Sequence, residues 1–329
     1  MPSKNSAIAS APIPPTKNQS GNNLVWNVAD GYVQLARRTD KDDNLQQPVV
    51  GKPPHDKPDN DLIAAPDNRA PLTKPADPPV ETKQVAPFQS TWSFAEAVTP
   101  SLTRVFAVRD DYAVCLISPG YHPLKRATAK TFSIAACSKP DSDGPDHEKV
   151  LVYYVVEDDN SDRRVAEYNI KEKRAYILST DLSSDPSDAT RLCAIYYAPP
   201  GETTEEPYIF FQKKDKIFEY RTQKNSSSEL TGITDLRSPT PLAICRFNKK
   251  VYLFWLSSTY RLMYSSRSAG QWTSGTTVPA PAGGHQPFKA DTQSDLSVVA
   301  DEEKGQITIY YKQVDSDNEV DAYVWKVAP

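Results

Sequence analysis

Apolar and polar residues alternate with a period of two along much of the chain, and the alternating runs come in pairs. Near the C-terminus, the runs 307–311 (ITIYY) and 320–325 (VDAYVW) flank the polar segment 315–318 (DSDN). Alternation on both sides of an Asp/Ser/Asn turn predicts a β-hairpin. Because one hairpin is not stable alone, we expect this one to belong to a larger sheet.

The same hairpin pattern occurs six times. Hairpins are predicted at 23–38, 103–118, 150–170, 207–222, 251–266 and 305–325. A short strand of small apolar residues is predicted before each, at 6–10, 61–65, 133–137, 192–195, 242–245 and 295–300. Fourth strands are predicted at 175–182 and 270–278. A repeat of roughly 50 residues with three or four antiparallel strands is typical of a β-propeller blade.

We therefore predict an all-β fold, a six-bladed β-propeller with three- to four-stranded antiparallel blades, as a single domain over residues 1–329. The blades are expected near 6–48, 61–120, 133–183, 192–236, 242–278 and 295–329. A pair of β-sandwiches is the structural alternative. The Pro-rich segments 49–60 and 66–90 cannot form ladder strands and are predicted to be long loops. They are either decoration or a lid over a pocket.

Charge and composition exclude several classes of function. The net charge is −4 and the basic residues are scattered, so no nucleic-acid partner is expected. No apolar run is long enough to span a membrane, and no membrane partner is expected. The N-terminus lacks the apolar region of a secretory signal, so we expect a cytoplasmic protein. The cysteines are predicted to be reduced and buried: Cys115, Cys137, Cys193 and Cys245.

Signatures of catalysis and metal binding are sparse. The chain has no GxSxG, HExxH or phosphate-binding loop. Its four histidines, in loop-like segments, lack metal-ligand spacing. Pairs of Asp residues such as 110–111 fall in hairpin turns, where Asp is common anyway. We expect no metal site and no cofactor.

The repeat resembles the blade of the fungal fucose-specific lectins, on the segments ITIYY (307–311), VDAYVW (320–325), GQWTSG (270–275) and DLIAA (61–65). This resemblance implies a six-bladed propeller with sugar sites between blades. In that family a site uses an Arg from the second strand, a Glu from the third and an aromatic side chain from the neighbouring blade. The aligned Arg positions hold Leu24, Arg104, Leu151, Tyr208, Tyr252 and Thr308. The aligned Glu positions hold Gln34, Cys115, Glu167, Glu219, Met263 and Ala322.

By this alignment no blade keeps both sugar ligands, and most replacements are apolar or aromatic. Such a surface suits a hydrophobic small molecule better than fucose, because unsatisfied polar groups of a bound sugar would cost about 1–3 kcal/mol each. The chain also resembles, in fold and lost sugar ligands, the fungal hetero-Diels–Alderases of tropolone sesquiterpenoid pathways. That resemblance implies a cofactor-independent pericyclic enzyme joining a tropolone quinone methide to a humulene-type terpene.

For that reaction an apolar cavity and one hydrogen-bond donor are sufficient. The candidate donors are Arg104, Tyr208, Tyr252 and His285. The candidate substrate-binding residues are Trp255, Trp272, Phe288, Glu167 and Glu219. Two other functions remain open: a glycan-binding protein with altered specificity, and a propeller that only binds other proteins. The enzyme hypothesis predicts one deep apolar pocket, and the lectin hypothesis predicts several shallow grooves. The interaction hypothesis predicts a large exposed apolar patch.

Overall fold

The described part of the chain consists of strands joined by turns and loops. The computed structural model describes residues 7–12, 23–29, 32–38, 94–98, 103–118, 121–139, 150–158, 160–180, 182, 191–199, 202–268, 270–279, 289–291, 294–314 and 320–327. These residues form strands and no helix. The second half of the chain is described almost continuously, so the argument about a site rests mainly there.

The strands form antiparallel sheets, numbered here in chain order. Sheet 1 contains β1 (Ile8–Pro12), β2 (Asn23–Ala29) and β3 (Tyr32–Arg38). Sheet 2 contains β4 (Ala95–Val98), β5 (Thr103–Val108), β6 (Ala113–Ser118) and β7 (His122–Thr128). Sheet 3 contains β8 (Ile134–Ser138), β9 (Val150–Glu157), β10 (Arg163–Asn169) and β11 (Arg174–Ile177).

The remaining strands form three more sheets. Sheet 4 contains β12 (Leu192–Tyr197), β13 (Glu206–Lys213), β14 (Lys216–Arg221) and β15 (Ser226–Glu229). Sheet 5 contains β16 (Ala243–Phe247), β17 (Lys250–Leu256), β18 (Leu262–Ser268), β19 (Gln271–Trp272) and β20 (Thr276–Thr277). Sheet 6 contains β21 (Leu296–Asp301), β22 (Gln306–Tyr311) and β23 (Asp321–Lys326).

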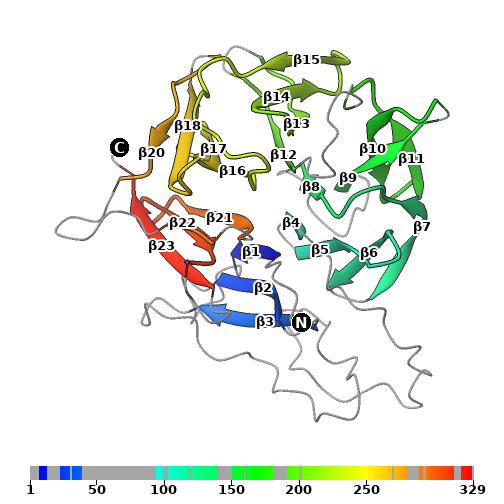
Figure 1. The fold of residues 1–329 in the computed structure, drawn as a ribbon, viewed down its shortest axis with the longest axis horizontal. Coiled ribbons are helices and arrows are strands. Elements are labelled where there is room, and N and C mark those ends of the chain that lie inside the picture. The colour runs from blue at the N-terminus through cyan, green and yellow to red at the C-terminus, as the bar shows by residue number, and fades with distance from the viewer. Residues whose placement is uncertain are drawn as a thin grey trace, which may run out of the picture.

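The sheets are arranged around a central axis, with the first strand of each innermost (Figure 1). Neighbouring innermost strands are in contact all the way round, in the order β1, β4, β8, β12, β16, β21 and back to β1. The two ends of the chain close the ring together. The backbone nitrogen of Ile8 donates to Asp295 Oδ2 at 3.2 Å, and Asn23 Nδ2 donates to the Tyr310 hydroxyl at 2.7 Å.

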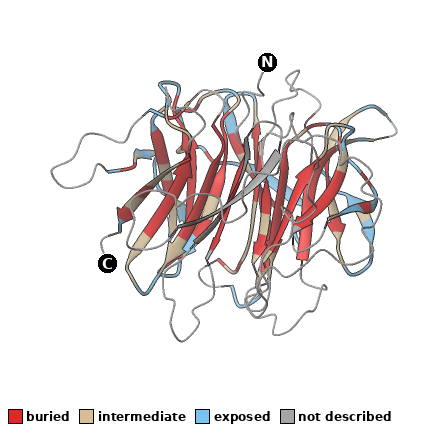
Figure 2. Ribbon diagram, turned by 90° about the horizontal axis from the view of Figure 1, so that it is seen from below, coloured by how far each residue is buried: buried red, intermediate tan, exposed pale blue. Residues whose placement is uncertain are grey.

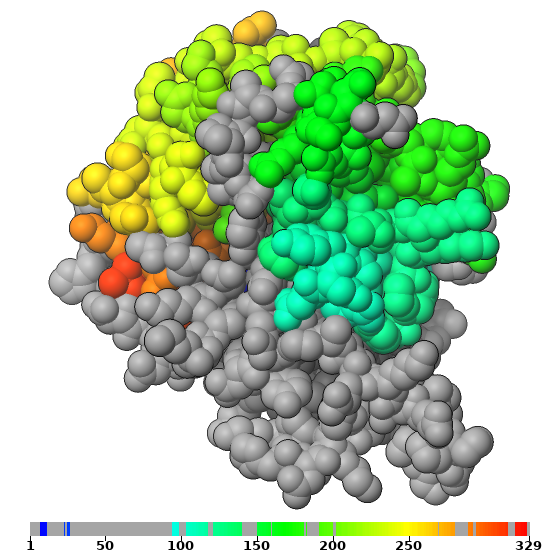
Figure 3. All heavy atoms as spheres, turned by 45° about the vertical axis from the view of Figure 1, so that its right-hand side comes forward, coloured from blue at the N-terminus to red at the C-terminus, as the bar shows by residue number. Residues whose placement is uncertain are grey.

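Both faces of the inner strands are packed against neighbouring sheets, so strands such as β9, β13 and β17 are buried along most of their length, whereas the outer strands β7, β11 and β15 are largely exposed (Figure 2). Alternate residues of one strand therefore enter two different cores. On β22, Ile307 and Ile309 pack with the sheet 5 side, whereas Tyr310 packs with Ile8 and Val25 of sheet 1. In the space-filling view, sheets 2, 3 and 4 form adjoining sectors from cyan to yellow-green (Figure 3). The alternation seen in the sequence thus marks two buried faces rather than one wet and one dry face.

The prediction of an all-β propeller of antiparallel sheets is confirmed, and the β-sandwich alternative is wrong. The four cysteines are free and buried, as expected. No group of three or more metal-ligating side chains occurs in the described segments. Among the same segments, no helix is long and apolar enough to cross a membrane.

Sheet 2 differs from the prediction. Its innermost strand is β4, at Ala95–Val98, and not the segment 61–65, which lies outside the described residues together with both Pro-rich loops. The short connection from β4 to β5 explains the choice, because antiparallel neighbours are usually joined by few residues. Glu96 in this strand obscured the small apolar pattern. The outer strand β7 was not predicted either, and it places His122 in an exposed strand position rather than a loop.

Candidate functional site

The junction between sheets 4 and 5 gathers polar and aromatic side chains at one place. Glu219 lies on β14 and Tyr208 on β13, where Glu219 is paired with Phe210. Residues 208, 210 and 219 therefore share the face of sheet 4 that meets sheet 5. From sheet 5, Trp272 comes from the short strand β19 and Arg267 from β18, and these two residues are paired with each other.

Arg267 and Glu219 form an ion pair across this junction. Arg267 Nη1 donates to Glu219 Oε1 at 2.9 Å and to Oε2 at 2.7 Å. The indole nitrogen of Trp272 also donates to Glu219 Oε2, at 3.0 Å. The side chains of Arg267 and Glu219 are only 11% and 5% exposed. A carboxylate buried to this degree requires such partners, so the three side chains form one unit.

Three aromatic rings surround the Arg267 guanidinium. Its central carbon lies 5.9 Å from the ring centre of Tyr197 and 5.8 Å from those of Tyr208 and Trp272. The two tyrosine rings are 4.3 Å apart. Arg267 Nη1 donates to the Tyr197 hydroxyl at 2.5 Å. Guanidinium groups interact favourably with aromatic faces, so the rings hold Arg267 in a fixed position.

The titration behaviour of the site follows from burial and from this ion pair. Burial alone lowers the pKa of Arg267, but Glu219 and the Tyr197 hydroxyl outweigh it, and the pKa lies above its ordinary value. Burial, followed by the proximity of Glu219, raises the pKa of Tyr197. Burial likewise raises the pKa of Tyr208. The site therefore holds a permanent cation beside neutral phenols.

A second ion pair lies at the rim of the same junction. Arg221, paired with Tyr208 across the sheet, donates from Nε to Glu206 Oε1 at 2.8 Å and from Nη1 to Glu202 Oε1 at 2.9 Å. Its guanidinium carbon lies 5.1 Å from the Tyr208 ring centre. The ring of Tyr208 is thus in contact with two arginines. Its hydroxyl oxygen is buried and has no hydrogen-bond partner among the described residues.

This arrangement is suited to a ligand with both hydroxyl groups and an apolar face. Arg267 uses Nε on the Gly270 carbonyl at 3.3 Å and Nη1 on Tyr197 and Glu219, and no described residue accepts from its Nη2. Trp272 is only partly buried and can offer its ring to a ligand. Charged donors, a carboxylate acceptor and an exposed aromatic ring are the elements of saccharide recognition.

The other predicted residues are not part of this polar cluster, although Trp255 belongs to the apolar core of the same junction. Arg104 is buried on β5 of sheet 2, where burial lowers its pKa. Tyr252 lies on the opposite face of sheet 5, packed edge-on against Trp325 with ring centres 5.8 Å apart. Trp255 is completely buried and donates from Nε1 to the Asp235 carbonyl at 2.8 Å. Glu167 lies between sheets 3 and 4, accepts from the Tyr153 hydroxyl at 2.9 Å, and has a pKa raised by burial.

Two predicted residues, His285 and Phe288, lie outside the described residues. Of the predicted set, the structure brings Tyr208, Glu219 and Trp272 together. The sequence analysis missed Arg267, which is the arginine needed for the comparison with a sugar site. It searched for an Arg on the second strand of the same blade, whereas Arg267 comes from the third strand of the next sheet. The signal was available, since Arg267 stands five residues before Trp272 in the segment RSAGQW.

The predicted register between second and third strands was also wrong in sheet 5. Tyr252 is paired with Ser266, and Met263 with Trp255. Tyr252 and Met263 therefore project from opposite faces and cannot form one site. In sheet 4 the alignment kept Tyr208 and Glu219 on one face, because it was displaced by two residues and not by an odd number.

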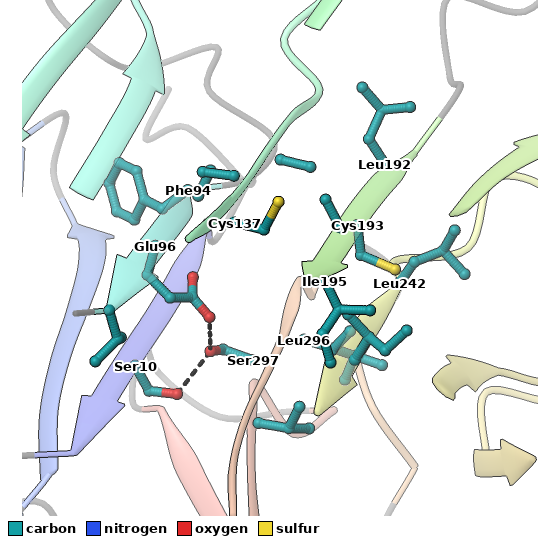
Figure 4. A pocket seen from close by; sticks show the side chains of 18 of the residues that line it. Ser10, Phe94, Glu96, Cys137, Leu192, Cys193, Ile195, Leu242, Leu296 and Ser297 are labelled. Atoms are coloured by element: carbon teal, nitrogen blue, oxygen red, sulfur yellow. Dashed lines mark hydrogen bonds between the residues drawn. The ribbon is translucent and has the colours of Figure 1, made fainter. Parts of the chain in front are cut away.

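A cavity of about 340 Å³ lies at the axis, where the innermost strands meet (Figure 4). Glu96 of β4 points into it beside Ser297 of β21. Ser297 Oγ donates to Glu96 Oε1 at 3.4 Å and lies 2.6 Å from Ser10 Oγ. The rest of its wall is largely apolar. None of the predicted donors Arg104, Tyr208 and Tyr252 lines this cavity.

The sequence and the fold of the chain were compared with those of known proteins. No protein-family model and no curated protein matches the sequence. The solved structures include the lectin SapL1 in complex with α-methyl fucoside, at a TM-score of 0.61 and 12% identity, covering 98% of this chain and 92% of that one. The chain shares the fold of fucose-binding lectins.

Two more lectins support that statement. The fucose-specific lectin from Aleuria aurantia matches at a TM-score of 0.59 and 13% identity, over 99% of this chain and 97% of that one. AofleA from Arthrobotrys oligospora matches at a TM-score of 0.59 and 13% identity, over 100% and 89%. At this level of identity the similarity concerns the fold, and the ligand has to be argued from the side chains.

Proposed function

We propose that this protein is a lectin-type, six-bladed propeller that binds a fucose-containing glycan at the junction between sheets 4 and 5. Each sheet counts as one blade in this proposal. The observation that carries it is the Arg267–Glu219 ion pair with Trp272 beside it. These are the three residue types that the fucose-lectin resemblance requires, with the acid on the third strand and the aromatic residue on the neighbouring sheet.

The chemistry of the three side chains fits a deoxy sugar. Arg267 Nη2 is available to donate to sugar oxygens, and the Glu219 carboxylate can accept from a hydroxyl in addition to its present donors. The partly exposed Trp272 ring offers an apolar surface to the C–H face of the sugar. Because donor and acceptor are already held in place by the ion pair, little conformational entropy is lost on binding.

Unlike a multivalent lectin, this protein is proposed to have a single glycan site per chain. Among the described residues, an Arg–Glu ion pair beside a Trp occurs only at this junction. The described segments therefore offer no second equivalent site from which avidity could arise. We expect one weak site per chain, detected more readily by solution methods than by agglutination.

The test is binding of methyl α-L-fucoside to the full chain, followed by saturation-transfer NMR and isothermal titration calorimetry. Glu219→Gln, Arg267→Lys and Trp272→Ala are expected to reduce affinity at least tenfold. Glu229→Gln and Arg174→Lys, which change exposed residues outside the junction, serve as matched controls and are expected to bind normally. Absence of binding to fucosides and to an array of other glycans would overturn the proposal.

A second candidate function is the hetero-Diels–Alder cycloaddition. The axial cavity, whose lining includes many apolar side chains, is the observation that favours it. At about 340 Å³ the cavity is near the lower end of the range of ligand pockets, roughly 300–1,000 Å³, and this reaction has to hold two bulky partners at once. Incubation with a quinone methide precursor and humulene tests it, through the adduct ratio and stereochemistry against a control without protein. Equal adduct ratios in the two samples would count against the enzyme.

The remaining alternative, a protein-interaction propeller, finds less support. Among the described residues the exposed large hydrophobic side chains are Tyr112, Tyr176, Ile177 and Val314. They lie on three separate segments of the chain and do not form the extended apolar patch that this function requires.

A further inference from the structure

The axial cavity contains a polar wall that the proposed glycan site does not use. Glu96 projects from β4 into the cavity, with Ser297 and Ser10 next to it (Figure 4). Ser10, Asp295 and Ser297 are only 2%, 4% and 3% exposed. Glu96 retains more accessible surface although it lies deep among the innermost strands, because that surface faces the cavity. One wall thus presents two carboxyl groups and two hydroxyl groups.

The charges around this wall are not balanced. Asp295 accepts a hydrogen bond from the Ile8 backbone nitrogen at 3.2 Å and is close enough to Arg191 for the guanidinium to stabilise its charge. Arg246, also at the cavity, pairs with Glu205 at 3.4 Å instead. No basic side chain among the described residues pairs with Glu96. A carboxyl group in this position lacks the cation that would stabilise its charged form.

Apolar side chains from several sheets form the rest of the cavity lining. Its labelled members in Figure 4 include Ile195, Leu242 and Leu296. The cavity is partly open to solvent, so a small molecule can enter it. A pocket with an apolar wall and a few convergent polar groups is the usual form of a small-molecule site.

We propose that the axial cavity is a binding site for a small primary amine with an apolar body. The ammonium group of the ligand would bind the Glu96 carboxylate and donate to the hydroxyl oxygens of Ser297 and Ser10. Its hydrocarbon part would pack against Ile195, Leu242 and Leu296. The ligand supplies the cation that this wall lacks, and three donors of one ammonium match three acceptors.

Proton balance gives the proposal a measurable signature. Burial, and then the charge of Asp295, raises the pKa of Glu96 to about 8, so its carboxyl group is mostly protonated at pH 7. An ammonium ion that binds at pH 7 therefore displaces the Glu96 proton into solvent. Affinity should rise as the pH approaches 8 and then level off, until the amine itself loses its charge near its own pKa.

Three other groups near Glu96 bear on this dependence. Burial raises the pKa of Asp295 to about 7, and Arg191 opposes that rise. The thiol of Cys193 has a pKa raised by burial and then by Glu96, and it stays neutral over this range. Asp295 therefore titrates before Glu96, and its charge adds to the attraction for an ammonium ion. Both carboxyl groups give the same sign of pH dependence.

The test uses phenethylamine as the probe and 2-phenylethanol as its neutral analogue. Calorimetric titrations of the full chain in phosphate and in Tris at pH 7 measure proton release, and titrations from pH 6 to 8 measure the change in affinity. We expect one phenethylamine per chain, affinity that rises with pH, and at least tenfold weaker binding of the alcohol. Glu96→Gln should reduce amine affinity at least tenfold, and Glu229→Gln, an exposed control on β15, should leave it unchanged.

Several results would overturn the proposal. Equal affinity for amine and alcohol, unchanged binding by Glu96→Gln, or affinity that falls between pH 6 and 8 each contradict it, as does failure of phenethylamine and of the smaller isobutylamine to bind. Circular dichroism and thermal unfolding establish that Glu96→Gln is folded. We expect this variant to be at least as stable as the parent, because it removes a buried acid. Fucoside binding by the same variant remains unaffected, which separates this site from the proposed glycan site.

Discussion

One nitrogen of Arg267, Nη1, lies 2.9 Å and 2.7 Å from the two carboxylate oxygens of Glu219 and so bridges two sheets that also share an apolar core. The pair joins β14 to β18. Since both side chains are nearly buried, it acts on stability as well as on binding. A buried ion pair contributes little against an apolar replacement of both partners, but it is costly to break from one side.

Replacing one partner is therefore expected to lower the free energy of unfolding more than replacing both partners. Glu219→Leu leaves Arg267 buried without its acceptor and should lower the free energy of unfolding by about 3–5 kcal/mol. The double variant Glu219→Leu/Arg267→Met should lose less unfolding free energy than the two single variants lose together, with a coupling energy of about 1–3 kcal/mol. Urea unfolding of the four proteins measures this cycle. Additive effects within about 0.5 kcal/mol would show that the two side chains do not interact.

The hydroxyl groups of two buried tyrosines should respond in opposite ways to removal. Tyr208 has no hydrogen-bond partner for its hydroxyl among the described residues, whereas Tyr153 donates to Glu167 at 2.9 Å. Tyr208→Phe should be neutral or raise the free energy of unfolding by about 1 kcal/mol, and Tyr153→Phe should lower it by about 1–2 kcal/mol. Urea unfolding of each variant measures the change. A loss of stability in Tyr208→Phe would reveal a partner for that hydroxyl.

The repeat architecture could be predicted from the sequence because each strand carries its own signal. The aromatic second strands 207–211 and 251–255 lie fully within β13 and β17, and their hairpin partners follow them. The small-residue strands are innermost, as crowding at the axis requires. The local alternation therefore predicts where the strands lie, and the short connections between them make successive strands neighbours in one sheet.

The site could not be predicted in the same way, because it depends on which face a residue occupies in a neighbouring sheet. A displacement of one residue moves a side chain to the other face, as for Tyr252. Arg267 was missed since its partner Glu219 lies 48 residues earlier in the chain. Nothing in the sequence pattern pointed to Glu96, because the innermost strand of sheet 2 was predicted at residues 61–65 and not at β4. Contacts between sheets are set by packing and not by the local pattern.

Stability should decrease as the pH rises between about 5 and 8. Burial raises the pKa of Glu96 to about 8 and that of Asp295 to about 7, from ordinary values of 4.5 and 3.8. The folded state therefore binds more protons than the unfolded state in this range, and the free energy of unfolding falls with pH. The stabilising contribution is complete below the ordinary values and is lost as pH passes the folded values.

The slope identifies the groups responsible. Each carboxyl group contributes at most about 1.4 kcal/mol per pH unit. Glu96→Gln should remove most of the slope near pH 7–8, whereas Asp295→Asn should remove at most about half of the slope near pH 5–6, because Glu96 is also protonated there. Urea unfolding at half-unit steps of pH measures both, with Glu229→Gln as the exposed control. A parent protein whose stability rises from pH 5 to pH 8 would contradict the assignment.

A side chain at position 275 is expected to destabilise the fold because Gly275 packs directly on Trp255. A Cβ atom at this position would lie 2.7 Å from Cζ2 and 3.0 Å from Cη2 of that ring. The ring cannot move aside easily, since it is completely buried and its nitrogen donates to the Asp235 carbonyl at 2.8 Å. Gly275→Ala should therefore cost about 1–3 kcal/mol of unfolding free energy and shift the tryptophan fluorescence.

A matched control and a second substitution make this test specific. Ser274→Ala, at the exposed neighbouring position, should change stability by less than about 0.5 kcal/mol. Trp255→Phe replaces the indole by a smaller ring and is itself destabilising, but it relieves the contact with residue 275. The alanine should therefore cost clearly less in the Trp255→Phe background than in the parent. The same cost in both backgrounds would show that the strain arises from the backbone of Gly275 and not from its contact with Trp255.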